Sequence, residues 1–172
     1  MTVLYEEETI KRYIKRMFME EQLITHSQVA DYLGFKTSAI RQHALKGNLV
    51  PIFSRTIDKT QMRIYYYPDI VLFNQYIQTK HKNAGYDAYH KMIQTIDRKR
   101  VAELLAKHIW VSKDVCTYLS IGLTALDGLI KRKQLTPIFK LTERNTRLFF
   151  VNDVKLLKID YDAYLKFQKN KK

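Results

Sequence analysis

The sequence predicts a mainly helical α+β fold built from two tandem copies of one small unit. Three observations predict it. A stretch of 25 residues recurs 86 positions later without a gap. In both places the spacing of apolar residues changes from helical to strand-like in the same order. The third observation is composition: 46% of the 172 residues are hydrophobic and 12% are aromatic, which is enough to form a packed core.

The repeat is visible when the chain is aligned with itself. VADYLGFKTSAIRQHALKGNLVPIF (29–53) aligns with VCTYLSIGLTALDGLIKRKQLTPIF (115–139), and eight of the 25 positions are identical. After a shortening of two residues, QMRIYYYPDIVLF (61–73) aligns with NTRLFFVNDVKLL (145–157). The alignment indicates a tandem duplication, and such repeats define an architecture before any other signal does.

Two short helices are expected at the start of each copy. In the first copy, Thr25 and Gln28 form a capping-box pattern ahead of apolar residues at helical spacing. Gly34 is expected to end this helix. A second helix follows, and its inward face is predicted to include Ile40 and His43.

A β-hairpin and a further helix are expected next. The apolar and aromatic runs LVPIF and RIYYY flank the polar stretch TIDKTQ, and LTPIF and RLFFV flank TERNT in the second copy. Pro68-Asp69 and Asn152-Asp153 then favour a helix start, because Pro suits the first helical position and Asp suits a helix N-terminus.

A long helical pattern precedes each copy, over residues 6–22 and 86–107. The only break between the copies is KNAG at 82–85. The sequence therefore predicts two domains, residues 1–84 and 85–172, each with flanking helices.

Both copies resemble the winged helix-turn-helix unit of the MerR and phage excisionase families. The resemblance covers residues 24–73 and 109–157. It rests on VADYLG, on SAIRQHALKGNLVPIF, and on the pattern of Arg63, Tyr65 and Asp69, which recurs as Arg147, Phe149 and Asp153. It implies a mainly α fold with small β-hairpin wings, two tandem winged helix-turn-helix domains, and double-stranded DNA as the partner.

In this fold the second helix enters the major groove and its outward residues reach base edges. Arg can pair with guanine and Gln with adenine, each through two hydrogen bonds. In the first copy the predicted DNA-binding residues of this helix are Thr37, Ser38, Arg41, Gln42 and Lys46. An ordinary solvated helix face is the alternative.

The hairpins are expected to contact phosphates, which position a protein without reading sequence. The resemblance assigns this role most directly to Arg63, Tyr65 and Arg147. The other predicted residues in the hairpins and the second copy are Arg55, Lys59, Thr124, Lys131, Arg132, Lys140 and Arg144. For the other hairpin residues, a solvated hairpin tip is the alternative.

The two copies are also predicted to make different kinds of DNA contact. The second copy has Asp127-Gly128 where the first has Arg41-Gln42. The second half carries 18 basic and 9 acidic residues, against 12 and 8 in the first. We therefore expect the first copy to contact base edges and the second to bind phosphates. Asp127 is expected in a local salt bridge, because phosphates repel its charge; a hydrogen bond from a cytosine amino group is the alternative.

Charge and composition narrow the class of protein. With 30 Lys and Arg against 17 Asp and Glu, the net charge is +13, which indicates a polyanionic partner. No apolar run approaches the roughly 20 residues that a transmembrane helix needs, and the N-terminus does not resemble a signal peptide. The sequence predicts a cytoplasmic, nucleoid-associated protein that does not bind membranes.

Catalytic and metal-binding signatures are not found in the sequence. It contains no Gly-rich phosphate loop, no G-x-S-x-G and no H-E-x-x-H. The single cysteine, Cys116, and five scattered histidines do not have metal-ligand spacing. We expect a protein that is not an enzyme and that has no cofactor and no metal.

The function predicted from the sequence is sequence-specific binding of double-stranded DNA by a transcriptional regulator. One alternative is a DNA architectural factor of a mobile genetic element: a recombination directionality factor, or a plasmid or phage replication or segregation protein. Another, from a different class, is an interaction module that no longer binds DNA. A homodimer is possible.

Overall fold

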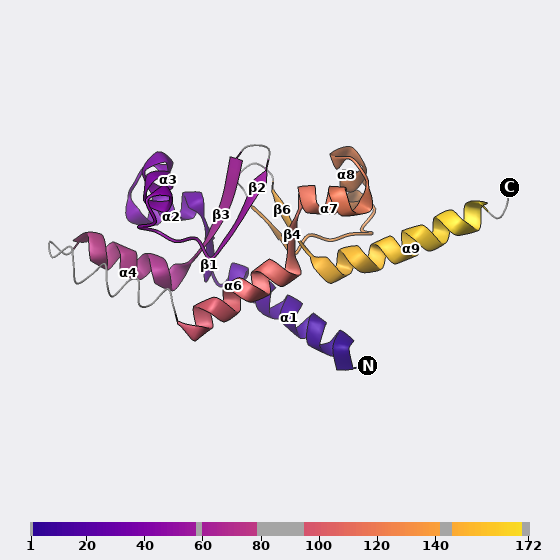
Figure 1. Cartoon of the computed structure of the whole chain (residues 1–172), viewed down its shortest axis with the longest axis horizontal. Helices are drawn as coiled ribbons and strands as arrows, with labels where there is room; N and C mark the ends of the chain where they lie inside the picture. The colour runs from indigo at the N-terminus through magenta and orange to yellow at the C-terminus, as the bar shows by residue number, and fades with distance from the viewer. Residues whose placement is uncertain (1, 58–59, 79–94, 142–145, 170–172) are drawn as a thin grey trace. The chain divides into compact units, whose positions relative to one another are not determined.

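The computed structural model describes residues 2–57, 60–78, 95–141 and 146–169 (Figure 1). This part of the chain is mixed α+β, with two small antiparallel sheets of three strands each. It forms two compact units. The first-repeat unit is Tyr13–Ala106, and the second-repeat unit is Met1–Arg12 together with Lys107–Lys172.

These units differ from the predicted domains 1–84 and 85–172 in the placement of the leading helices, which are the helices that precede each repeat. Helix α1 (Thr2–Met19) contributes its first part to the second-repeat unit, and most of helix α6 (Ile96–His108) belongs to the first-repeat unit. Each repeat is therefore completed by part of the helix that precedes the other repeat. The predicted break at 82–85 and residues 86–94 of the predicted long helix lie outside the described residues.

Two short helices open the first repeat, as predicted. Helix α2 (His26–Leu33) has the expected capping box: Thr25 Oγ1 accepts from the Gln28 N–H at 3.3 Å, and Gln28 Oε1 accepts from the Thr25 N–H at 2.8 Å. Gly34 ends the helix in the left-handed conformation at φ 68°. Helix α3 (Thr37–Leu45) follows and buries Ile40 completely.

The first sheet has three strands, one more than the predicted hairpin. Strands β2 (Phe53–Ile57) and β3 (Thr60–Tyr66) form the hairpin, with Ser54 opposite Arg63. Strand β1 (Leu23–Thr25) pairs with the other edge of β3, giving the order β1-β3-β2. All three residues of β1 are buried, so the sequence offers no alternation to reveal it.

The hairpin also differs from the predicted arms. Strand β2 begins at Phe53, after Pro51, which has no N–H to donate to a ladder. Thr56, Ile57, Thr60 and Gln61, which were expected in the polar connection, lie in the strands. The strands therefore project further beyond the core than the apolar runs indicated.

The core of the first-repeat unit lies between these elements and helix α4 (Tyr67–Gln78), which begins close to the predicted Pro68-Asp69 start. The fully buried members include Val29 from α2, Ile40 from α3, Tyr65 from β3, and Phe73 from α4. Because α2 and α3 are both fixed against α4 and the sheet, the outward face of α3 has a defined orientation within its unit.

The second repeat has the same order of elements. They are β4 (Ile109–Val111), α7 (Ser112–Leu119), α8 (Leu123–Lys131), β5 (Phe139–Lys140), β6 (Arg147–Phe150) and α9 (Val151–Lys169). The sheet order is β4-β6-β5, which matches β1-β3-β2 position by position. The matching buried residues Val115, Leu126 and Phe149 form the corresponding core. In Figure 1, the helix after the last strand runs past the helix pair of its own repeat in both cases.

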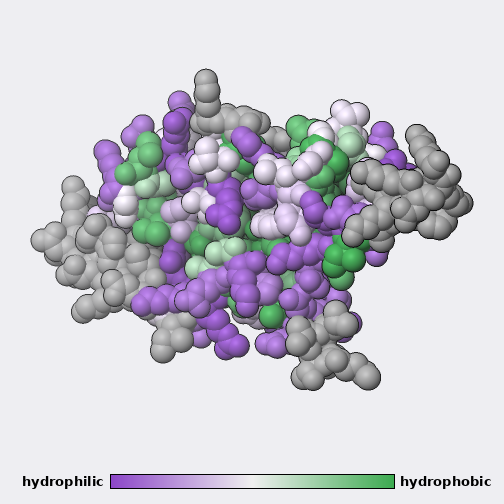
Figure 2. Space-filling model, turned by 45° about the vertical axis from the view of Figure 1, so that its right-hand side comes forward, coloured by the Kyte–Doolittle hydropathy of each residue, from purple (hydrophilic) through white to green (hydrophobic). Residues whose placement is uncertain are grey.

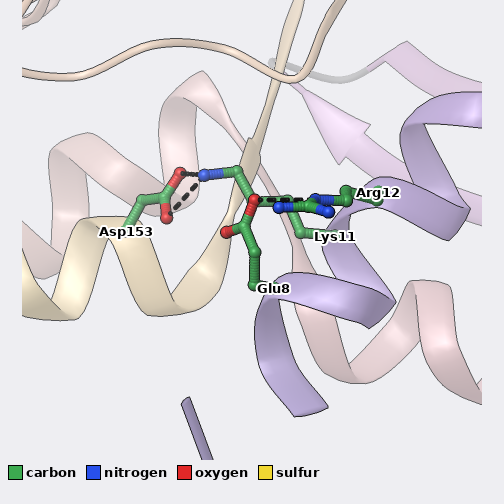
Figure 3. A network of polar contacts seen from close by, with 4 residues as sticks. All are labelled: Glu8, Lys11, Arg12 and Asp153. Atoms are coloured by element: carbon green, nitrogen blue, oxygen red, sulfur yellow. Dashed lines mark hydrogen bonds and ion pairs between the residues drawn. The ribbon is translucent and has the colours of Figure 1, made fainter. Parts of the chain in front are cut away.

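Each leading helix also supplies a cation to the Asp that opens the final helix of the other repeat. Lys11 Nζ lies 2.8 Å from Asp153 Oδ2, and both side chains are about a quarter exposed (29% and 26%) (Figure 3). Arg98 Nε lies 2.6 Å from Asp69 Oδ2, and these side chains are only 9% and 1% exposed. Both repeats therefore have this ion pair, but it is buried in the first-repeat unit and partly exposed in the second-repeat unit.

Ser120 offers a test of the conformation at the end of α7. It occupies the position of Gly34 and has φ 56°, in the left-handed region. A Cβ in this region costs roughly 1 to 2 kcal/mol. Replacing Ser120 with Gly is expected to stabilise the second-repeat unit by about 1 kcal/mol, measured by urea unfolding.

Thr117, within α7, provides the matched control for Ser120. Thr117→Gly removes a side chain from the same helix at ordinary helical φ, so the free energy of unfolding should fall by a few tenths of a kcal/mol or more. An unfolding midpoint that drops for Ser120→Gly as it does for Thr117→Gly would contradict the strain argument.

Candidate nucleic-acid interface

Helix α3 presents the polar residues that the sequence analysis selected. Its buried side is held by Ile40, while Thr37, Ser38, Arg41 and Gln42 are all exposed. Lys46 follows at the C-terminal cap and is also exposed. A guanidinium and a carboxamide are therefore adjacent on one solvent-facing helix, which is the chemistry needed to contact base edges.

The N-terminus of α3 has no side-chain cap. Lys36 occupies the N-cap position without a capping hydrogen bond, and Gly122 does so for α8. By contrast, Thr25 and Gln28 form a capping box at the start of α2. The first N–H groups of a helix need partners from outside the helix, and a phosphate oxygen is well suited to that role.

His26 fixes the start of α3 relative to the sheet. Its Nε2 lies 2.9 Å from the carbonyl oxygen of Thr37, and its Nδ1 lies 3.2 Å from the hydroxyl of Tyr65. Because a carbonyl can only accept, Nε2 donates to Thr37, and in the neutral ring Nδ1 then accepts from the Tyr65 hydroxyl. This role of His26 could not be predicted from the sequence, because its two partners lie 11 and 39 positions away and no local pattern connects them.

Tyr65 requires a correction to the predicted set of phosphate contacts. It is fully buried, packs in the core of the first-repeat unit, and directs its hydroxyl to His26. Tyr65 lies on the same face of strand β3 as Arg63, but at a position that the core covers completely. Tyr65 therefore orients α3 through His26, and its side chain is not available at the surface of this structure.

The hairpin of the first-repeat unit carries two of the predicted arginines. Arg55 on β2 is half-buried, with its guanidinium carbon 5.0 Å from the centre of the Phe53 ring. Arg63 on β3 is half-buried and donates a hydrogen bond to Gln61. In Figure 1, α3 and the free end of the hairpin point toward the same edge of this unit. Lys59 lies outside the described residues.

The second-repeat unit presents a different set of side chains on the matching helix. Thr124 and Lys131 are exposed on α8, Arg132 at its C-terminal cap is exposed, and Lys140 is exposed on β5. Arg132 Nε donates to Gln134 at 2.9 Å. Leu123, which is 61% exposed, occupies the position of Thr37. Arg144 lies outside the described residues.

The remaining predicted residue, Arg147, is in an ion pair. Its Nη1 donates to Asp127 Oδ1, so the hairpin and helix α8 are joined by opposite charges. The local salt bridge predicted for Asp127 is thereby confirmed. Arg147 is 21% exposed and Asp127 is 47% exposed.

His43 and Asp69, both in the first-repeat unit, have shifted pKa values. Burial, and then the nearby Lys46, lower the pKa of His43, whose ring packs between Phe35 and Phe73. Burial raises the pKa of Asp69, and the hydrogen bond and charge of Arg98 oppose this shift. His43 packs against the core residue Phe73 and Asp69 pairs with the buried Arg98, which indicates a structural role for both.

The described residues expose both hydrophilic side chains and single large hydrophobic ones, such as Leu45 and Leu123. On the face shown in Figure 2, hydrophobic residues gather only in small separate groups. Within the described part of the chain, no helix is long and apolar enough to cross a membrane. No three His, Cys, Asp or Glu side chains of the described residues lie together in a way that could hold a metal ion.

Comparison with known proteins gives no family assignment: no protein-family model, no curated protein and no solved structure matches the chain. The repeat, the residues at its surface and the charge of the chain are therefore the observations that bear on function.

Proposed function

We propose that the chain contains two winged helix-turn-helix domains and binds double-stranded DNA as a sequence-specific transcriptional regulator. It acts by binding and has no catalytic role. The observation that carries the proposal is the exposed Arg41-Gln42 pair on an uncapped helix beside a hairpin with Arg55 and Arg63. The net charge of +13 supports a polyanionic partner.

The order of elements supports this assignment. In each repeat two short helices meet at a tight turn, and a hairpin and a further helix follow. A helix placed second in such a pair can enter the major groove while the hairpin lies along the phosphate backbone. The core positions of Ile40 and Leu126 turn the polar faces of α3 and α8 to solvent.

A DNA architectural factor is the second candidate. The difference between the two units favours it, because the exposed Arg-Gln pair of α3 has no equivalent on α8. One unit would then choose a site while the other adds contacts that do not depend on sequence. A DNA-bending measurement separates the candidates: an architectural factor bends its site strongly, whereas a regulator binds it without a large bend.

Salt dependence provides the test of the proposal. If six to eight basic side chains neutralise phosphates, the logarithm of affinity should fall against the logarithm of salt concentration with a slope of roughly −5 to −7. Fluorescence anisotropy with a labelled duplex between about 50 and 200 mM salt measures this slope.

Lys15→Ala is the matched control, because Lys15 is exposed on α1 and is not among the proposed contacts. Its slope should equal that of the unaltered chain. An affinity that hardly changes over the same salt range would contradict DNA binding.

A further inference from the structure

The ion pair between Asp127 and Arg147 joins the two elements that the proposed function places on DNA. Asp127 lies on α8, and Arg147 is the first residue of β6. Arg147 Nη1 donates to Asp127 Oδ1, which fills one of the guanidinium directions that a phosphate would use. Nearly half of the Asp127 side chain (47%) is exposed, so its charge also faces any approaching ligand.

The first repeat shows what this arrangement replaces. Arg41 stands at the position of Asp127, and Arg63 stands at the position of Arg147. Arg63 donates to the neutral carboxamide of Gln61 and keeps its net positive charge. The first-repeat unit therefore presents two cations where the second-repeat unit presents a neutralised pair.

We propose that Asp127 is a negative determinant of DNA binding, which neutralises Arg147 and limits the affinity of the second-repeat unit for phosphates. This inference rests on the proposed function. A carboxylate in this place competes with phosphate for the same guanidinium and repels the backbone. The effect is independent of sequence, so Asp127 keeps general DNA affinity low and leaves selectivity to the first-repeat unit.

Asp127→Asn tests the inference, because it removes the charge and keeps an oxygen that can still accept from Arg147. The full chain is titrated with a labelled duplex of random sequence. Affinity is expected to rise about three- to tenfold, and the salt slope to become steeper by about one unit as Arg147 gains a phosphate. Asp160→Asn removes the same charge from an exposed position on α9, and its affinity should change less than twofold.

A double-mutant cycle with Arg147→Ala identifies the group that binds the additional phosphate. In the unaltered chain, Arg147→Ala should leave the salt slope unchanged, since Arg147 neutralises no phosphate there. Affinity should fall only through the charge of the unpaired Asp127. In the Asp127→Asn background, the same substitution should abolish most of the increase in affinity. Equal unfolding midpoints of the variants would show that the changes act on binding.

The possible outcomes separate this inference from the proposed function. If the unaltered chain binds DNA but Asp127→Asn binds no more tightly than Asp160→Asn, the role of Asp127 is contradicted and DNA binding stands. If Arg147→Ala flattens the salt slope equally in both backgrounds, the neutralisation is contradicted. If neither the unaltered chain nor Asp127→Asn binds duplex DNA, the proposed function fails and this inference fails with it.

Discussion

Arg98→Ala is expected to destabilise the first-repeat unit by about 3 to 5 kcal/mol, the usual loss when one partner of a buried ion pair is removed. Arg98 Nε contacts Asp69 at 2.6 Å, and its Nη2 donates to the Val50 carbonyl at 2.9 Å. The second oxygen of Asp69, Oδ1, is buried with no hydrogen-bond partner among the described residues. Without Arg98 the carboxylate is buried and unpaired. Chemical unfolding of the full chain measures the effect.

Lys11→Ala is the matched control, because Lys11 occupies the same place opposite Asp153 in the other repeat. Both side chains of this pair reach solvent, so its removal should cost only about 0 to 1 kcal/mol. The two substitutions remove equivalent charges at sites that differ in burial. Similar losses of stability for both would contradict the argument that burial determines the effect.

Acid should reduce the Arg98→Ala penalty. Burial raises the pKa of Asp69 in the folded chain, and removing Arg98 leaves this shift unopposed. A carboxyl with a raised folded pKa contributes stability below its unfolded pKa of about 3.9 and loses it as pH rises through the folded pKa. The difference between variant and unaltered chain should therefore be smallest near pH 4 and grow toward neutrality. A penalty that is constant with pH would mean that reduced packing, and not the carboxylate, causes it.

Arg41→Ala is expected to reduce affinity for the preferred DNA site by about 1 to 3 kcal/mol and to leave binding to random DNA nearly unchanged. Arg41 is exposed on α3 beside Gln42, where the substitution removes a base-reading side chain and leaves the phosphate-binding residues in place. The preferred DNA site is identified first, by repeated rounds of binding and amplification of random duplexes. The ratio of the two affinities is the measured quantity.

The combined change Lys131→Ala and Arg132→Ala is the comparison for Arg41→Ala. Both residues are exposed at the end of α8, where no Arg-Gln pair is present. Specific and random DNA should be weakened alike, and the salt slope should flatten by about one unit for each phosphate that is no longer neutralised. If this double change removed site preference and Arg41→Ala did not, base contacts would belong to the second repeat and phosphate contacts to the first.

Much of the local structure could be predicted from the sequence, because its signals are local. Thr25, Gln28 and Gly34 mark the ends of α2, and the capping box and left-handed turn occur there. The apolar residues Ile40 and Leu126 define the buried faces of α3 and α8. The exposed polar residues of α3 follow from the same periodicity, since residues opposite a buried stripe face solvent.

The third strand of each sheet could not be predicted, because Leu23–Thr25 and Ile109–Val111 have only three residues each, too few for a strand pattern to be recognised. The burial of Tyr65 was also missed. From the strand pattern alone, Tyr65 could face the core or the solvent. The packing of α2, α3 and α4 against it decides that it faces the core. The family pattern gave Tyr65 a surface role that its hydrogen bond to His26 does not permit.

The sequence by itself determined the duplication, the order of elements, the charge and the identity of the polar residues on α3. These depend on spacing along the chain and on side-chain chemistry. Only the tertiary structure decided which charges meet: Arg98 with Asp69 at 29 positions' separation, Lys11 with Asp153 at 142, and Arg147 with Asp127 at 20. Such pairs depend on how separate elements pack. The two partners of an ion pair have no regular spacing along the chain, so a sequence pattern cannot predict them.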